Sequence, residues 1–261
     1  MDKRKVIYYT DELNNEFSTA QIEKKNIDEN YIYCHNSLFK RFTRFFWYRI
    51  IATPFAFIYT KISFGHRTFG RKKLNSFKGT GYFLYGNHTQ DIGDAFLPTM
   101  INFPQSDYCI AHANNVSMPI LGHITPSLGA LPLPDDLKAY KNFISAINRR
   151  IGEGNTVVVY PEAHIWPYYT KIRPFTDVSF KYPVDLDTPV FCFTNTYKKR
   201  KLRRKPRIIT YIDGPFYPDS TLSKRERRQK LRDEVYNAMC TRAKESDIEI
   251  IKYIKREQEN G

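Results

Sequence analysis

The sequence has little of what marks several protein classes. Its 261 residues hold four cysteines, which lie far apart at Cys34, Cys109, Cys192 and Cys240. Such scattered thiols exclude a disulfide scaffold, and we expect them to be reduced in a cytosolic setting. The motifs GxGxxG and GxxxxGK[ST] are absent, so neither a dinucleotide site nor a P-loop is predicted. The histidines lack metal-ligand spacing, and we expect no metal site.

Long apolar runs are also missing. The N-terminus has basic residues but no apolar stretch with a cleavage site after it, so no signal peptide is predicted. The most apolar stretch, 38–64, is interrupted by Arg49 and Pro54 well short of the ~20 residues that cross a bilayer. It interleaves basic and aromatic residues, which is typical of a membrane-interface anchor. We expect two short interfacial helices broken at Pro54, with an amphipathic helix packed on its own domain as the alternative.

Positive charge and aromatic residues are abundant. Lysine plus arginine (41) minus aspartate plus glutamate (27) gives a net charge of +14, and 15% of the residues are aromatic. This balance favours anionic lipid, phosphorylated substrates or nucleic acid as partners. Eight basic residues fall within 198–207. We expect them to form a solvated turn between two strands, or else a contact for headgroups, a carrier protein or nucleic acid.

From residue 80 onward, strand-like and helix-like patterns alternate. Short β-branched or aromatic runs predict strands at 82–85, 108–111, 157–160, 189–194 and 207–212. Helical spacing predicts a helix over 135–151, and a Ser223–Glu226 capping box opens a C-terminal helix. The alternation predicts an α/β fold with a mostly parallel central sheet flanked by helices. We expect residues 1–75 to be a helical, membrane-associating segment and residues 76–261 to be the α/β domain.

Polar side chains follow two of the predicted strands. The first strand end carries Asn87, His88, Asp91 and Asp94, and the 157–160 strand end carries Pro161, Glu162 and His164. Open α/β sheets bind ligands at the carboxyl ends of their strands. A histidine beside a carboxylate is suited to taking a proton from a hydroxyl near neutral pH. The alternative is structural: either aspartate caps the helix that begins there.

The order of these blocks resembles the glycerolipid acyltransferases of the 1-acyl-glycerol-3-phosphate acyltransferase family. The resemblance covers roughly residues 80–215. It rests on the Asn-His and Pro-Glu pairs at the two strand ends, on Phe175 and Phe180, and on the Pro-Val pair at 189–190.

In that family an aspartate follows the histidine after four intervening residues. Here that position is Gly93, and the aspartate comes one residue later. The resemblance therefore implies a divergent member whose catalytic residues are His88 and Asp94, with Asp91 as the rival.

The resemblance implies an activity. His88, oriented by the aspartate, would deprotonate a hydroxyl of a lysophospholipid or related lipid, which then attacks the thioester of acyl-CoA or acyl-carrier protein. No other cofactor is expected, and the enzyme would be peripheral or monotopic on the cytoplasmic face of a membrane, with no nucleic acid partner. Backbone amides near Gly86 or in the 161–163 turn would stabilise the oxyanion. Glu162 would order that turn or hold the acceptor, while Asn87 and Pro161 would shape the substrate site.

The family's two phosphate-binding arginines are missing. The second block, 129–134, has no basic residue, and Ile165 replaces the arginine of the Pro-Glu block. We therefore expect lysophosphatidic acid to be a poor acceptor unless Lys171 or Arg173 turns inward, solvent exposure being their alternative. Two other classes stay open, which are a catalytically inactive lipid-binding relative and a basic nucleic-acid-binding protein.

Overall fold

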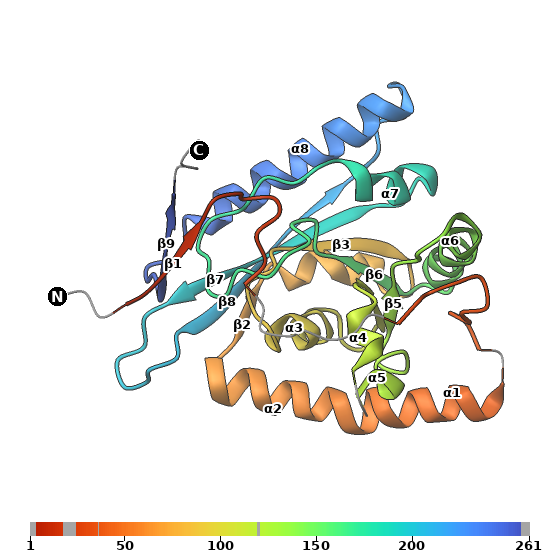
Figure 1. Cartoon of the computed structure of the whole chain (residues 1–261), viewed down its shortest axis with the longest axis horizontal. Coiled ribbons are helices and arrows are strands. Elements are labelled where there is room, and N and C mark those ends of the chain that lie inside the picture. The colour runs from red at the N-terminus through yellow and green to blue at the C-terminus, as the bar shows by residue number, and fades with distance from the viewer. Residues whose placement is uncertain (1–3, 18–24, 36, 119–120, 257–261) are drawn as a thin grey trace, which may run out of the picture.

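A seven-stranded sheet dominates the computed structural model, which describes residues 4–17, 25–35, 37–118 and 121–256 (Figure 1). Its strands, in spatial order, are β2 (Arg67–Phe69), β8 (Arg207–Phe216), β7 (Val190–Lys198), β3 (Tyr82–Gly86), β6 (Thr156–Val159), β4 (Asp107–Ala111) and β5 (Ala130–Pro132). The five strands from β7 to β5 run parallel, and β8 is antiparallel to β7. The prediction of a mostly parallel α/β fold is confirmed.

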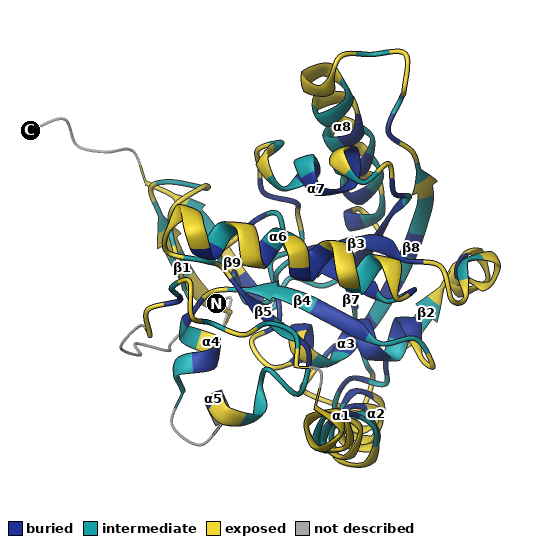
Figure 2. Ribbon diagram, turned by 90° about the vertical axis from the view of Figure 1, so that its right-hand side faces the viewer, coloured by how far each residue is buried: buried dark blue, intermediate teal, exposed yellow. Residues whose placement is uncertain are grey.

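Helices cover both faces of this sheet. Successive side chains of β3 point to opposite sides, and all of them are buried, so each face needs a covering layer. Phe83 and Tyr85 pack with α6 (Leu137–Gly152) and α8 (Lys224–Ala243). Tyr82 and Leu84 pack with η2 (Arg71–Phe77) and α3 (Gly93–Asn102). The remaining helical elements are α4 (Asn114–Ser117), α5 (Leu121–Ile124), η3 (Val178–Phe180) and α7 (Lys181–Asp185). Figure 2 shows the buried strands between these helices.

The predicted helix N-termini are present. Asp136 caps α6, where its carboxylate accepts the amides of Lys138 and Ala139, both at 2.8 Å. At α8 the Glu226 carboxylate accepts the Ser223 amide at 3.0 Å, and the Ser223 hydroxyl accepts the Glu226 amide. This is the capping box that the sequence predicted.

One long helical arm crosses the outer side of α3 (Figure 1). The arm, residues 38–64, consists of α1 (Leu38–Phe45), the π-helical segment η1 (Phe46–Ala52) and α2 (Thr53–Phe64). The prediction that Pro54 breaks it is wrong. Proline clashes with the carbonyl four residues earlier in an α-helix. The wider π turn before it, in which the Thr53 amide reaches Tyr48 O five residues back, lets the helix continue.

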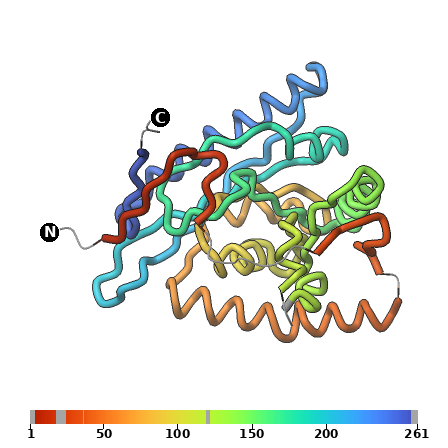
Figure 3. Tube along the Cα trace, viewed as in Figure 1, coloured from red at the N-terminus to blue at the C-terminus, as the bar shows by residue number. Residues whose placement is uncertain are grey.

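The two chain ends meet beside the sheet. Strand β1 (Lys5–Tyr9) pairs in parallel with β9 (Ile251–Lys255), and Figure 3 shows these segments running together. The N-terminal part therefore contains strands besides the predicted helices. The division at residue 75 stays a prediction, and residues 1–3, 18–24, 36, 119–120 and 257–261 within the two predicted parts lie outside the described ones.

A buried acid joins the arm to the sheet and generates a testable expectation. Asp107 at the start of β4 accepts hydrogen bonds from Tyr48 of the arm (3.2 Å) and from Asn102. Burial raises the pKa of this carboxyl from 3.8 to about 6.

Between these two pKa values the folded chain keeps a proton that the unfolded chain has lost. Stability from Asp107 is therefore greatest below pH 4 and is lost as the pH rises through 6, by about 3 kcal/mol. We expect Asp107→Asn to gain that much relative to the wild type between pH 4 and pH 7, as measured by urea unfolding. A difference between the two proteins that does not change with pH would contradict this.

Candidate active site

His88 and Asp94 form a hydrogen-bonded pair at the carboxyl end of β3. His88 Nδ1 lies 2.8 Å from Asp94 Oδ2. The same carboxylate oxygen accepts the amides of Thr89 (2.8 Å) and Gln90 (2.9 Å). Because a carboxylate only accepts, His88 Nδ1 carries the proton and Nε2 keeps its lone pair. The partly exposed imidazole is thereby prepared to accept a proton at Nε2.

Asp94, and not Asp91, holds this position for a structural reason. Helix α3 begins at Gly93, so Asp94 lies in its first turn, where the helix dipole favours a carboxylate. A Cβ on Gly93 would lie 2.8 Å from the Gln90 side chain, so glycine permits this tight turn. Asp94 is buried, and burial raises the pKa of its carboxyl, opposed by its bond from His88. Asp91 is exposed one turn earlier, and among the described residues none bonds its carboxylate.

Tyr160 supports the histidine ring from the end of β6. The two rings stack at 4.4 Å with an interplanar angle of 18°. The Tyr160 hydroxyl donates to the backbone oxygen of Asp94 at 2.5 Å. From the sequence, Tyr160 is predicted only as the last residue of a strand. Its position after a β-branched run, beside the Pro-Glu block, was the signal available.

Glu162 ties the Pro161 turn to His88. Its carboxylate accepts the His88 amide at 3.1 Å and the Arg173 amide at 3.0 Å. Arg173 Nη2 lies 3.5 Å from the same carboxylate, and neither side chain has exposed surface. Burial raises the pKa of the Glu162 carboxyl, and the charge of Arg173 opposes the shift. Of the two predicted roles, Glu162 therefore has the geometry to order the turn, because solvent does not reach it.

Arg173 turns inward but does not face open space. Besides Glu162, its guanidinium donates to the backbone oxygens of His164 and of Glu12 (3.2 Å) and lies 4.9 Å from the Trp166 ring. Lys171 is exposed. The structure therefore brings neither cation to His88 as a free phosphate ligand.

Other predicted residues have structural partners. The Asn87 side chain is buried and bonds both backbone groups of Asn195, the oxygen at 3.1 Å and the amide at 2.8 Å. The Ala163 amide donates to Tyr160 O at 3.1 Å, and the His88 amide is held by Glu162. These amides are therefore unavailable to an oxyanion. Fewer of the oxyanion donors predicted near Gly86 and in the 161–163 turn therefore remain.

The N-terminal segment packs on the same turn, which the sequence did not reveal. Glu16 accepts the Ile165 amide at 3.2 Å and lies 3.1 Å from His164 Nδ1. Trp166 donates its indole N–H to Asn15 O at 2.8 Å, and its amide donates to His88 O at 3.1 Å. The Glu16 carboxylate thus lies at Ile165, the position at which the family that the sequence resembles has an arginine.

No metal-binding group of three or more His, Cys, Asp or Glu side chains occurs in the part of the chain that the structure describes. The arrangement around His88 has the geometry that general-base chemistry requires, with a buried orienting carboxylate and a fixed neighbouring turn.

Comparison with known proteins adds two findings. Residues 69–194, which contain His88, Asp94 and the Pro161 turn, match a family model described as Acyltransferase. No curated protein matches the sequence. The chain is also similar to the crystal structure of the 1-acyl-sn-glycerophosphate (LPA) acyltransferase PlsC from Thermotoga maritima. The TM-score is 0.53 at 19% identity, over 77% of this chain and 78% of that one, and this likeness shows a shared fold.

The Glu162–Arg173 pair predicts a contrast between two neighbouring cations. Arg173→Leu leaves a buried carboxylate without its partner, so we expect it to destabilise the fold by about 3 kcal/mol or more. Lys171→Ala removes an exposed side chain and should change stability by less than about 0.5 kcal/mol. Urea unfolding of both variants measures this. If both effects are small, the pair does not hold the turn.

Proposed function

We propose that the chain acylates a lipid hydroxyl, because residues 69–194 match the acyltransferase family model, in agreement with the resemblance in its sequence. The observation that carries the proposal is the 2.8 Å pair of His88 Nδ1 and Asp94 Oδ2, which leaves Nε2 as a base. The proposed donor is acyl-CoA or acyl-carrier protein, and the acceptor is a lysophospholipid or related lipid.

The proposed reaction needs one base and no covalent enzyme intermediate. His88 Nε2 takes the proton of the acceptor hydroxyl while its oxygen attacks the thioester carbonyl carbon. The tetrahedral intermediate then collapses, a C–O ester bond replaces the C–S bond, and the leaving thiolate recovers the proton from the imidazolium. Asp94 stabilises that imidazolium, and Tyr160 keeps the ring in plane for both transfers.

The arm supports attachment to a membrane surface. Eleven of its large apolar side chains are exposed: Leu38, Phe39, Phe42, Phe45, Phe46, Ile50, Ile51, Phe55, Phe57, Ile58 and Ile62. An apolar surface of this extent marks an interaction site. No helix among the described residues is both long and apolar enough to cross a membrane. Phe55 packs on Phe96 of α3 at 5.4 Å, so an arm lying in the interface would bring the catalytic helix to the lipid.

Local charge argues against a phosphomonoester acceptor. Leu131, from the block that lacks its arginine, is buried, and Glu162 neutralises Arg173. Glu16 adds a carboxylate at Ile165. A dianionic headgroup there would lose hydration without compensating cations. A neutral sugar headgroup avoids this cost, and a diester, which carries one negative charge instead of two, meets less of it.

The base is tested by three single substitutions. We expect His88→Ala to lower kcat by a factor of ~10²–10⁴ in a folded protein, because the general base is lost. Asp94→Asn should be similarly harmful, and Asp91→Asn should be mild, since only Asp94 contacts the ring. Acyl transfer from acyl-CoA to a lyso-lipid extract measures all three. An unchanged rate in folded His88→Ala would remove the mechanism, and a wild type inactive on every acceptor would favour the lipid-binding relative.

Acceptor preference is tested with a lyso-lipid panel. We expect kcat/KM for lysophosphatidic acid to fall below that for lyso-lipids with diester heads. Glu16→Gln keeps an oxygen for the Ile165 amide but removes the charge, so it should raise the relative value for lysophosphatidic acid about fivefold. Lys171→Ala should change nothing. If lysophosphatidic acid is the best acceptor in all three proteins, the missing arginines do not matter. If it is best only with Lys171 present, that lysine binds the phosphate.

Membrane attachment is tested by charge insertion in the arm. Phe39→Glu/Phe42→Glu should reduce sedimentation with anionic vesicles at least about tenfold, because both side chains are exposed on the apolar surface. Leu137→Glu/Val178→Glu makes the same change at exposed residues outside the arm and should have little effect. Binding that survives in the arm variant but vanishes in high salt would point to the basic hairpin at 198–207.

A further inference from the structure

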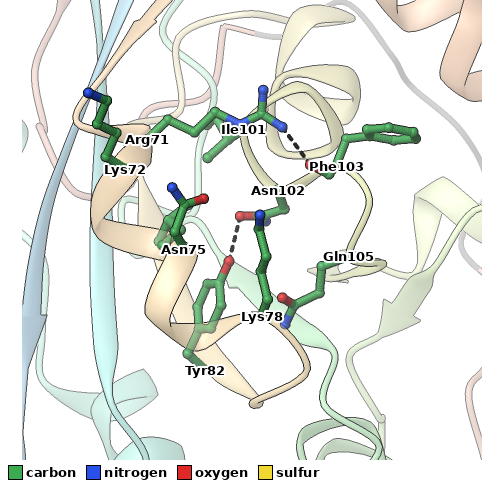
Figure 4. A pocket seen from close by; sticks show the side chains of 10 residues that line it. Arg71, Lys72, Asn75, Lys78, Tyr82, Ile101, Asn102, Phe103 and Gln105 are labelled. Carbon is green, nitrogen blue, oxygen red and sulfur yellow. Dashed lines mark hydrogen bonds between the residues drawn. The ribbon is translucent and has the colours of Figure 1, made fainter.

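A basic pocket lies at the opposite end of β3 from His88. This cavity of about 240 Å³ opens between η2, the end of α3 and residues 103–105 (Figure 4). Its lining includes Arg71, Lys72, Asn75, Lys78, Tyr82 and Gln105. Tyr82 begins β3 and His88 follows its end, so at about 3.3 Å per residue the pocket is ~20 Å from the base. It is not part of the active site.

The charge of this pocket is uncompensated. Its lining includes three cations and no acid. Across the ranges that the structure describes, no carboxylate lies within ion-pair distance of Arg71, Lys72 or Lys78. The neighbouring Lys73 differs, because it pairs with Asp213 at 3.0 Å. Cations gathered around a concave surface without counter-charges raise the local concentration of anions.

The walls of the pocket are held in place. The Arg71 guanidinium donates to Phe103 O, and Tyr82 donates to Asn102 Oδ1 at 2.8 Å. Gln105 Nε2 bonds the backbone oxygens of Thr80 (3.0 Å) and Gly154 (2.7 Å). Figure 4 shows the Lys78 ammonium, the Asn75 amide and the Arg71 guanidinium around one space, with Lys72 at its rim. The Arg71 guanidinium and the Gln105 amide are therefore held in place before any ligand arrives, whereas Lys72, Asn75 and Lys78 are exposed.

The dimensions indicate a small ligand. Pockets for drug-sized molecules span roughly 300–1,000 Å³, and this one is smaller. A nucleotide-bearing donor would not fit inside it, whereas a single phosphate with a few attached atoms would. Arginine offers paired N–H donors to phosphate oxygens, and lysine supplies a point charge.

We propose that this pocket binds a phosphate group, carried either by a lipid headgroup or by a soluble phosphate compound. The pocket adjoins the arm, because Arg49 of η1 bonds Pro104 O and Ser106 Oγ (3.0 Å) in the loop that also supplies Phe103 and Gln105. A bound phosphate would neutralise Arg71 and Lys78 and bridge η2 to that loop. This binding goes beyond the proposed acyl transfer and does not depend on it.

The test is calorimetric titration of the whole protein with inorganic phosphate against chloride at matched ionic strength. We expect one saturable site per chain, weakened about tenfold or more in Lys78→Gln and in Arg71→Gln. Lys141→Gln removes the same charge from an exposed position of α6 and should bind as the wild type does. Circular dichroism and unfolding of each variant establish that it is folded.

A vesicle experiment distinguishes a lipid headgroup from a soluble phosphate compound as the ligand. Sedimentation compares vesicles containing phosphatidic acid, a monoester, with those containing the diester phosphatidylglycerol at equal mole fraction. A preference for phosphatidic acid that Lys78→Gln removes identifies a lipid headgroup. Saturable inorganic phosphate binding without that preference identifies a soluble compound. Absence of binding in both the calorimetric and the vesicle experiment, or binding unchanged in Lys78→Gln and Arg71→Gln, overturns the proposal.

Discussion

A buried carboxylate, that of Glu162, holds the two loops of the site against each other. It accepts the His88 amide from the end of β3 and pairs with Arg173 from the far side of the turn after β6. Two buried charges are tolerated only as partners, because each alone would cost several kcal/mol to desolvate. Arg173 is therefore engaged in this ion pair, and the His88 backbone, from which the ring projects, is held in place.

The proposed catalytic function follows from this fixed frame. With the His88 backbone held by Glu162, Asp94 sets the proton on Nδ1 and Tyr160 stacks on the ring. The base thus projects from a rigid strand end, where positional error is small. The same contacts affect which acceptor can bind. Arg173 is paired with Glu162, and Glu16 places a carboxylate at Ile165.

The part of the site that lies at strand ends could be predicted from the sequence. β3 and β6 are parallel neighbours, so their carboxyl ends, and with them His88 and Glu162, had to meet. The pairing of β1 with β9 could not be predicted, since two short segments more than 240 residues apart leave no local pattern. The inward turn of Arg173 has no pattern either, because Lys171 nearby has the same character and is exposed. The continuation of the helix through Pro54 could not be predicted either, because the π turn that accommodates the proline contains Tyr48, which is buried only in the folded chain.

In the proposed mechanism His88 presents an unprotonated Nε2 to the acceptor hydroxyl while Asp94 holds the proton on Nδ1. Nitrogen-15 NMR of the labelled His88 imidazole in its neutral form measures this directly. We expect a pyrrole-type shift for Nδ1 and a pyridine-type shift for Nε2, with both shifts moving toward the rapidly exchanging average in Asp94→Asn. A proton on Nε2 in the wild type, or shifts that Asp94→Asn does not change, would contradict it.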